Sequence, residues 1–185
     1  MVVLLSPPPI VSLPSEKFYR SASSPQKPLP LPRLEDESAS TGLSVVIPAF
    51  NETKRLPSML ETAFNFLQKK NYTFEIIIVD DGSTDGTTEA ALELAKNYKS
   101  YDIRVITLAA NLGKGGAVRH GMLHSRGAKL LMVDADGASR FEDLDLLWTE
   151  LEKMAPAEEP AMVIGSRAHL VNSEAVVKAR FRFIM

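Results

Sequence analysis

The chain has 185 residues, no cysteine and a net charge of −2, because 21 Lys and Arg residues balance 23 Asp and Glu residues. The lack of cysteine excludes a disulfide-bonded scaffold and a zinc site with cysteine ligands. The near-neutral charge provides no chain-wide positive field, so general nucleic-acid binding is not expected. Apolar residues make up 45% of the sequence, which is enough to build a core.

The first 41 residues are rich in proline and serine and differ from the rest of the chain. The apolar run Met1–Leu5 is interrupted by Pro7–Pro9 and lacks a preceding basic region, which argues against a cleaved signal peptide. The composition of Pro14–Thr41 offers too little apolar surface to offset the entropy of ordering. We therefore expect a disordered segment over residues 1–41 and a folded domain over residues 42–185. No stretch approaches the ~20 apolar residues of a membrane-spanning helix.

Short apolar runs alternate with stretches of helical periodicity from Leu43 onward. The runs predict strands at Leu43–Ile47, Phe74–Val79, Ile103–Leu108, Leu130–Val133 and Met162–Ile164. Helices are predicted at Pro57–Leu67, at Ala91–Tyr98 after the candidate caps Thr84 and Asp85, and at Gly116–His124, Leu144–Met154 and Glu174–Phe183. This alternation predicts an α/β fold, with a Rossmann-like, mostly parallel sheet and helices on both faces.

Polar, glycine-containing clusters follow four of the predicted strands. They are Pro48–Glu52, Asp80–Gly86, Asn111–Gly116 and Asp134–Gly137. One such loop alone carries little information, because glycine, aspartate and asparagine are common there as turn and capping residues. Ligands of parallel sheets nevertheless bind beyond the carboxyl ends of the strands. The functional site is therefore expected among these four loops.

Asp134 and Asp136 directly follow the fourth predicted strand. Residues i and i+2 at a strand end project to the same side, so these two carboxylates are expected to converge outside the sheet. A divalent cation relieves their repulsion, and Mg²⁺ or Mn²⁺ typically takes one or two carboxylates together with phosphate oxygens. The spacing favours a metal ion that holds a diphosphate. The alternative is that one aspartate caps the next helix and the other is solvated.

Lys114 lies in the glycine-rich stretch Gly113–Gly116, where a helix is expected to begin. Free backbone N–H groups and a lysine at such a place suit a phosphate or a ribose. The stretch matches neither a P-loop nor a dinucleotide-binding glycine pattern, so ATP hydrolysis and dinucleotide oxidoreduction lose support. His120 and His124 share a helical face, but the glutamate of a zinc helix is absent. No Gly-x-Ser-x-Gly elbow supports acyl transfer.

Four motifs occur together in a characteristic order: Val45–Glu52, Ile78–Thr87, Asn111–Ala117 and Asp134–Gly137. Together they resemble the inverting family 2 glycosyltransferases. Flanking stretches narrow the resemblance to the branch that glucosylates dolichyl phosphate: Gly115–Arg119, His124–Gly127, Met132–Arg140 and Gly165–Leu170. The resemblance implies a GT-A fold and transfer of glucose from UDP-glucose to the lipid acceptor dolichyl phosphate. It also implies a location at the cytosolic face of the endoplasmic reticulum membrane and a role in protein N-glycosylation.

The resemblance also implies roles for individual residues. The uracil and ribose of the donor would be framed by Pro48, Phe50, Glu52, Asp80 and Asp81. Lys114 would approach the ribose or the diphosphate. Asp134 and Asp136 would be the catalytic carboxylates, with Asp134 also facing the nucleotide and Asp136 binding Mg²⁺ or Mn²⁺. Such a cation stabilises the charge on departing UDP, so the leaving group requires no proton.

The resemblance covers about Leu43 to Met185. Relatives in this family typically begin with a membrane-anchoring helix and extend well beyond the matching region, so we expect the anchor and the rest of the acceptor side to be missing from this sequence. Two alternatives stay open. One is a catalytically inactive nucleotide-sugar-binding fragment, and the other is a related family 2 transferase that uses another donor, such as GDP-mannose.

Overall fold

The structure is a computed structural model that describes residues 13–32, 39–154 and 161–165. Its strands are β1 (Phe18–Ser21), β2 (Ser24–Pro30), β3 (Thr41–Ala49), β4 (Phe74–Asp80), β5 (Asp102–Thr107) and β6 (Gly127–Met132). Its helices are α1 (Leu56–Lys69), α2 (Thr87–Asn97), α3 (Gly113–Leu123) and α4 (Leu144–Met154), with short 3₁₀ turns η1 (Pro14–Lys17) and η2 (Phe141–Asp143). The chain forms two compact units, one up to Phe141 and one from Glu142, and the sheet belongs to the first. No helix among the described residues has the length and apolarity that crossing a membrane requires.

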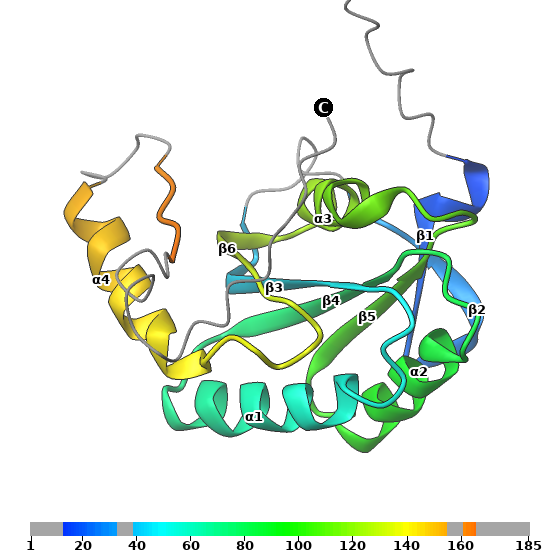
Figure 1. Cartoon of the computed structure of the whole chain (residues 1–185), viewed down its shortest axis with the longest axis horizontal. Coiled ribbons are helices and arrows are strands. Elements are labelled where there is room, and N and C mark those ends of the chain that lie inside the picture. Colours follow the sequence, from blue (N-terminus) through cyan, green and yellow to red (C-terminus); the bar gives the residue numbers. More distant parts are fainter. Residues whose placement is uncertain (1–12, 33–38, 155–160, 166–185) are drawn as a thin grey trace, which may run out of the picture. The chain divides into compact units, whose positions relative to one another are not determined.

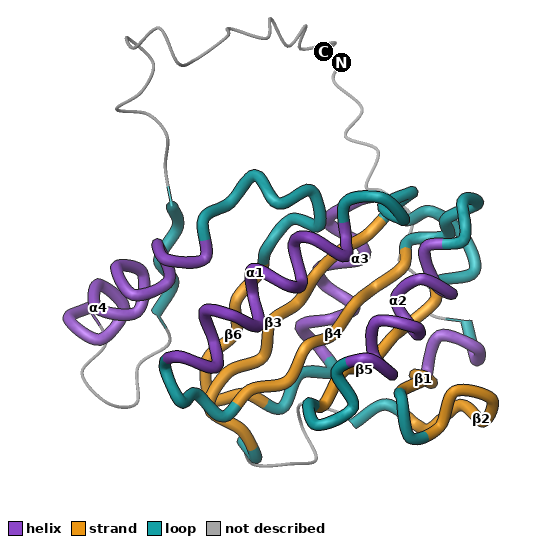
Figure 2. The backbone as a smooth tube through the Cα atoms, turned by 90° about the horizontal axis from the view of Figure 1, so that it is seen from below, coloured by secondary structure: helices purple, strands orange, loops and turns teal. Residues whose placement is uncertain are grey.

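All six strands form one sheet in the order β2-β1-β5-β4-β3-β6. The four strands from β3 to β6 run parallel, whereas β1 and β2 are antiparallel additions beside β5. Figures 1 and 2 show α1 and α2 on one face of the sheet and α3 on the other. The predicted α/β fold, a mostly parallel sheet covered on both faces, is confirmed.

The central strands β3 and β4 have helices on both faces, which is why their sequences are continuous apolar runs. The side chains of Val46, Ile77 and Val79 pack with Ala117 of α3 in one buried cluster. On the other face, α1 buries an apolar stripe against the sheet, and the ring of Phe64 stacks on Tyr98 with centroids 4.1 Å apart. The face of the core that each residue joins therefore follows from the alternation along the strands.

Several predicted element boundaries, and one predicted strand, differ from the structure. Strand β6 begins at Gly127 rather than Leu130, and α3 begins at Gly113 rather than Gly116 because Asn111 Oδ1 accepts a hydrogen bond from the Gly113 N–H at 2.8 Å. The strand predicted at Met162–Ile164 was wrong, since these residues pair with no strand in the described part of the chain, and Met162 and Ile164 are 75% and 73% exposed. The helix predicted at Glu174–Phe183 lies outside the described residues.

The prediction of a disordered linker was wrong for residues 14–30. Strand β1 pairs with β5 through Arg20 and Ser21, and β2 pairs with β1 to form a hairpin. Pro25, Pro28 and Pro30 lie on β2, the edge strand of the sheet, where a residue without an N–H group is tolerated. An edge strand gains its hydrogen bonds from one neighbour and needs little apolar burial, so composition alone did not reveal it.

His120 of α3 and His124, which directly follows the helix, bind the segment that contains this hairpin. His120 Nε2 donates a hydrogen bond to the carbonyl of Glu16 at 2.9 Å, and His124 Nδ1 donates one to the carbonyl of Pro32 at 2.6 Å. Burial and the neighbouring His124 lower the pKa of His120, which favours the neutral ring at pH 7.

A buried ion cluster lies at the amino end of the parallel strands. Glu75 of β4 is 1% exposed, and its Oε2 lies 2.9 Å from Arg126 Nη2 and 3.7 Å from Arg104 Nε. Its Oε1 accepts hydrogen bonds from Ser44 Oγ at 2.5 Å and from the Arg126 N–H at 2.6 Å. The carboxylate thus joins β3, β4, β5 and the segment that leads into β6.

The ion cluster leads to a prediction about stability. Glu75→Ala removes the buried carboxylate and leaves Arg104 and Arg126 with the more exposed Asp102 as their remaining acidic partner, so we expect the free energy of unfolding in urea to fall by about 3 kcal/mol. The matched control is Glu93→Ala, because Glu93 forms an exposed ion pair with Lys96, and a change below about 1 kcal/mol is expected. If Glu75→Ala and Glu93→Ala lowered the free energy of unfolding equally, the stabilising role of the buried ion cluster would be refuted.

Candidate functional site

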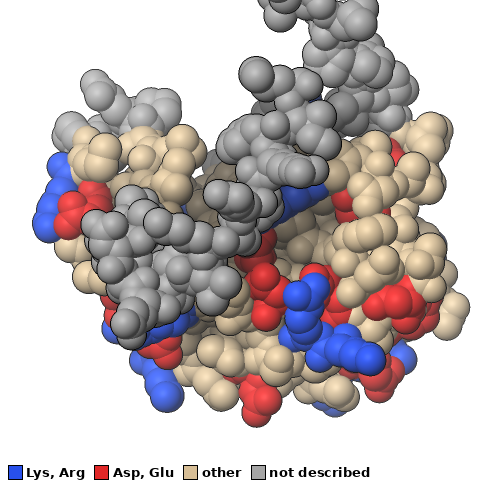
Figure 3. All heavy atoms as spheres, in the orientation of Figure 1, with Lys and Arg blue, Asp and Glu red and all other residues tan. Residues whose placement is uncertain are grey.

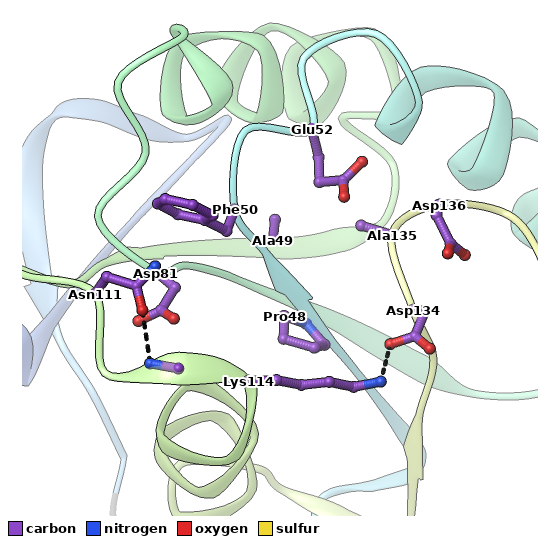
Figure 4. Close-up of a pocket in the computed structure, with 11 residues that line it drawn as sticks. Pro48, Ala49, Phe50, Glu52, Asp81, Asn111, Lys114, Asp134, Ala135 and Asp136 are labelled. Carbon is purple, nitrogen blue, oxygen red and sulfur yellow. Dashed lines mark hydrogen bonds and ion pairs between the residues drawn. The ribbon is translucent and has the colours of Figure 1, made fainter. Parts of the chain in front are cut away.

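A cavity of about 350 Å³ opens at the carboxyl ends of β3, β4 and β6, beside the start of α3 (Figure 4). All of its residues belong to the first compact unit. It is lined by Pro48, Ala49, Phe50, Glu52, Asp81, Asn111, Gly113, Lys114, Asp134, Ala135 and Asp136. Because parallel strands present their carboxyl ends at the same edge of the sheet, loops distant in sequence meet there.

The wall after β3 carries Pro48, Phe50 and Glu52. The ring of Phe50 is 46% exposed, which is unusual for a large apolar side chain and leaves an aromatic face available within the cavity. Glu52 behaves differently, because its carboxylate accepts hydrogen bonds from Arg55 Nε at 2.7 Å and Arg55 Nη2 at 2.5 Å. Phe50 can therefore contact a ligand directly, whereas Glu52 is held by an internal ion pair.

The two aspartates after β4 lie in different surroundings. Asp81 lines the cavity, and its Oδ1 accepts a hydrogen bond from the Leu112 N–H at 2.7 Å. Asp80 does not line it. Its carboxylate accepts hydrogen bonds from the Ser83 N–H at 2.9 Å and from the Thr88 hydroxyl, in the junction between β4 and α2. Successive residues of a strand project to opposite faces, so only one of this pair reaches the cavity.

Asp85 ties the loop after β3 to the start of α2. Its Oδ1 accepts a hydrogen bond from the Thr87 N–H at 3.0 Å, and its Oδ2 accepts one from the Thr53 N–H at 3.2 Å. Burial raises the pKa of Asp85, but the hydrogen bonds from Thr87 and Thr53 outweigh burial and lower the pKa to about 2. Asp85 therefore accepts from the first N–H of α2, although the N-cap residue is Gly86 rather than Asp85 or Thr84. The N–H of Thr84 donates to Asn51 Oδ1 at 3.0 Å.

Lys114, in the first turn of α3, reaches across the cavity to β6. Its Nζ lies 2.5 Å from Asp134 Oδ1, as Figure 4 shows. Both side chains are largely exposed, at 56% and 40%, so water and counterions screen this ion pair and either group can exchange its partner for a ligand. The adjacent N-terminus of α3 adds partial positive charge from its free N–H groups. This side of the cavity therefore suits an anion.

Asp134 and Asp136 both line the cavity, as their spacing predicted. Asp136 Oδ1 accepts a hydrogen bond from the Ala138 N–H at 2.9 Å, which fixes the carboxylate, while Oδ2 has no hydrogen bond to the described residues. Two carboxylates and no third acidic or histidine ligand within the described ranges suit a cation that takes its other ligands from phosphate and water. This donor set fits Mg²⁺ or Mn²⁺.

The structure brings together seven of the eight residues that the sequence pointed to. They are Pro48, Phe50, Glu52, Asp81, Lys114, Asp134 and Asp136. Asp80 is the exception. Sequence reasoning had not assigned four further lining residues, Ala49, Asn111, Gly113 and Ala135. Each lies within one of the polar clusters that follow the predicted strands. The clusters therefore predicted the location of these residues, although nothing in the individual side chains indicated a role.

Charged side chains of both signs lie next to one another on the face that Figure 3 shows. On the face that Figure 3 shows, the acidic and basic residues of the described parts are interspersed and form no large basic patch. This distribution agrees with the net charge of −2. It gives this face no feature typical of a nucleic-acid-binding surface.

Comparisons with known proteins agree with the motifs. Residues 44–170 match the sequence model described as Glycosyl transferase family 2. The chain is 44% identical over 185 residues to a dolichyl-phosphate beta-glucosyltransferase of Mus musculus, covering 96% of this chain and 56% of that protein. It is 49% identical over 148 residues to the enzyme of that name from Saccharomyces cerevisiae, covering 74% and 44%.

A solved structure of lower similarity is the mannosyltransferase PcManGT from Pyrobaculum calidifontis in complex with GDP-Man and Mn²⁺. It is 23% identical, with a TM-score of 0.47 over 60% of this chain and 31% of that chain. The chain spans about half the length of the curated relatives it matches.

The close approach of two loops beside the cavity yields a prediction. A Cβ at Gly82, where φ is +72°, would lie 3.0 Å from backbone atoms of both Ala110 and Asn111. Gly82→Ala should therefore lower the free energy of unfolding by more than about 1 kcal/mol. The control is Gly115→Ala within α3, where nothing lies within 4 Å of the added Cβ and the change should be neutral or stabilising. Urea denaturation of both variants measures this difference. An unchanged free energy of unfolding in Gly82→Ala would refute the close contact of Gly82 with Ala110 and Asn111.

Proposed function

The chain belongs to glycosyl transferase family 2, and we propose on that basis that it transfers glucose from UDP-glucose to dolichyl phosphate. The product would be dolichyl β-D-glucosyl phosphate, a glucose donor for protein N-glycosylation. The observation that carries the proposal is the convergence of Asp81, Lys114, Asp134 and Asp136 with the exposed ring of Phe50 in one cavity. The names of the relatives from mouse and yeast support the choice of sugar and acceptor.

The uridine would bind between the ends of β3 and β4. Phe50 offers an exposed aromatic face for a planar base, and Pro48 adds an apolar edge. Asp81 lies on the same wall, where a carboxylate oxygen can accept a hydrogen bond from the base or the ribose. Glu52 would not bind the donor directly, because its carboxylate already accepts hydrogen bonds from Arg55. Its role would be to fix the conformation of the loop after β3.

The diphosphate would bind between Lys114 and the two carboxylates of the β6 end. Lys114 would exchange Asp134 for a phosphate oxygen, and the free N–H groups of α3 would add further positive charge. Asp134 and Asp136 would face Mg²⁺ or Mn²⁺, which would supply Lewis-acid stabilisation of negative charge on the diphosphate. Of the two, Asp136 is the metal ligand we propose, since one of its oxygens is fixed by Ala138 and the other faces no described donor.

The reaction itself needs few protein groups. A phosphate oxygen of dolichyl phosphate forms a bond to C1 of glucose as the bond from C1 to the β-phosphate oxygen breaks, and UDP departs with the electron pair. The acceptor phosphate is already ionised near pH 7, because its second pKa is about 6, so no general base has to remove a proton. Lys114 and the helix N-terminus stabilise the charge that develops on UDP. We place this reaction at the cytosolic face of the endoplasmic reticulum membrane.

The test is transfer of radiolabelled glucose from UDP-glucose to dolichyl phosphate by the purified chain with Mn²⁺. We expect a labelled lipid product, and a loss of at least about 100-fold in Asp136→Asn, since that variant weakens the site for the cation that would stabilise charge on the departing UDP. Glu93→Gln, on the exposed face of α2, should keep full activity.

Three outcomes would contradict the proposal in different ways. Full activity of Asp136→Asn would refute the role of that carboxylate. Transfer from GDP-mannose in preference to UDP-glucose would identify a different donor. Metal-dependent UDP binding without any transfer would identify a donor-binding fragment whose acceptor side is not supplied by this chain.

A further inference from the structure

We propose that Glu16, in the turn that precedes the N-terminal hairpin, is a positioning residue of the donor site. It acts through the loop 108–112, which leads from β5 into α3 and carries Asn111 at the cavity. The inference rests on the proposed function, because the site in question is the proposed nucleotide site. Glu16 lies outside the four family motifs, so the proposal assigns a further segment of the chain to the positioning of that site.

Glu16 is a buried carboxylate whose hydrogen bonds reach the loop. It is 3% exposed, although it lies in a four-residue turn near the start of the described chain. Its Oε1 accepts a hydrogen bond from the Ala109 N–H at 3.2 Å, and its Oε2 accepts one from the Leu13 N–H at 2.8 Å. A carboxylate is costly to bury unless donors compensate for the lost water. These two N–H groups are the donors, and one of them belongs to a residue 93 positions away.

The turn around Glu16 is fixed to α3 as well as to the loop. The backbone carbonyl of Glu16 accepts the hydrogen bond from His120 Nε2 at 2.9 Å. Figure 1 shows the turn beside the segment that enters α3. The turn therefore joins the loop on one side and the third turn of the helix on the other. Lys114 and Gly113 lie between these two attachment points along the chain.

The loop is held from the opposite side by the site itself. Leu112 N–H donates to Asp81 Oδ1 at 2.7 Å, and Leu108 N–H donates to the carbonyl of Asp80 at 2.9 Å. The backbone at Ala110 and Asn111 lies against Gly82 with no room for a Cβ. Glu16 supplies the attachment at Ala109, between these contacts. Its carboxylate thus fixes the loop from outside the cavity, while Asp81 fixes it from within.

Loss of the outer attachment should affect binding more than folding. The loop would then sample conformations in which Asn111 and Lys114 leave their positions, and a ligand would have to order them on binding. We expect Glu16→Ala to weaken UDP binding in the presence of Mn²⁺ by about tenfold. Glu16→Gln keeps one oxygen that can accept from Ala109, so it should restore part of the affinity. Glu93→Ala and Glu93→Gln are matched controls on an exposed helix face and should bind UDP as the wild-type chain does.

The experiment pairs calorimetric UDP titration with amide hydrogen exchange of the ligand-free chain. In Glu16→Ala, exchange of residues 109–113 should rise while exchange of Ile76–Val79 in β4 stays unchanged. Glu16→Gln should give an intermediate rise, and both Glu93 variants none. In the wild-type chain, the Ala109 amide itself should be protected, a readout that needs no variant to fold.

The outcomes separate the two claims. If the wild-type chain binds no UDP, the proposed function fails, but hydrogen exchange still decides the role of Glu16. Unchanged exchange at residues 109–113 in Glu16→Ala would overturn the inference. An equal rise throughout the sheet would also overturn it, because it would show a general loss of stability. UDP affinity equal to that of the wild-type chain in a folded Glu16→Ala protein would do the same.

Discussion

The parallel alignment of β3, β4 and β6 is the constraint on which the rest of the structure depends. Strand β3 pairs with β4 from Leu43 to Ala49 and with β6 from Thr41 to Val46, which brings three strand ends to the same edge. Since β3 and β4 are covered by helices on both faces, no polar side chain can leave the sheet midway without being buried. Carboxylates and turns therefore gather where the strands end, and a cavity results that no single segment of the chain could form.

Charged side chains have different roles at the two ends of the sheet. At the amino end, the buried carboxylate of Glu75 is held by Arg104, by the partly buried Arg126 and by a serine hydroxyl. At the carboxyl end, Asp134 and Lys114 form an exposed pair that a ligand can separate. The first arrangement fixes the register of the strands. The exposed pair at the carboxyl end offers a positive group for an anion and a negative group for a cation. A diphosphate with a divalent metal presents both.

Periodicity and strand-end motifs predicted the sheet and most of the cavity, because both depend on local sequence. The sequence-based predictions failed where contacts between distant parts of the chain determine the structure. The hairpin of β1 and β2 forms because β5 offers an edge, which proline content does not reveal. Asp80 and Asp81 look equivalent in a motif, although strand alternation allows only one of them to reach the cavity. The hydrogen bond between Glu16 and Ala109 joins residues 93 positions apart and has no local signature.

The measurement that tests the central claim most directly is anomalous diffraction at the manganese edge from crystals of the chain grown with UDP and Mn²⁺. The account predicts one manganese peak beside the carboxylate of Asp136, with the diphosphate bridging the metal and Lys114, and with uracil against Phe50. Manganese bound away from the β6 end would contradict it. So would UDP bound outside the cavity, because either result would separate the carboxylates from the nucleotide they are proposed to hold.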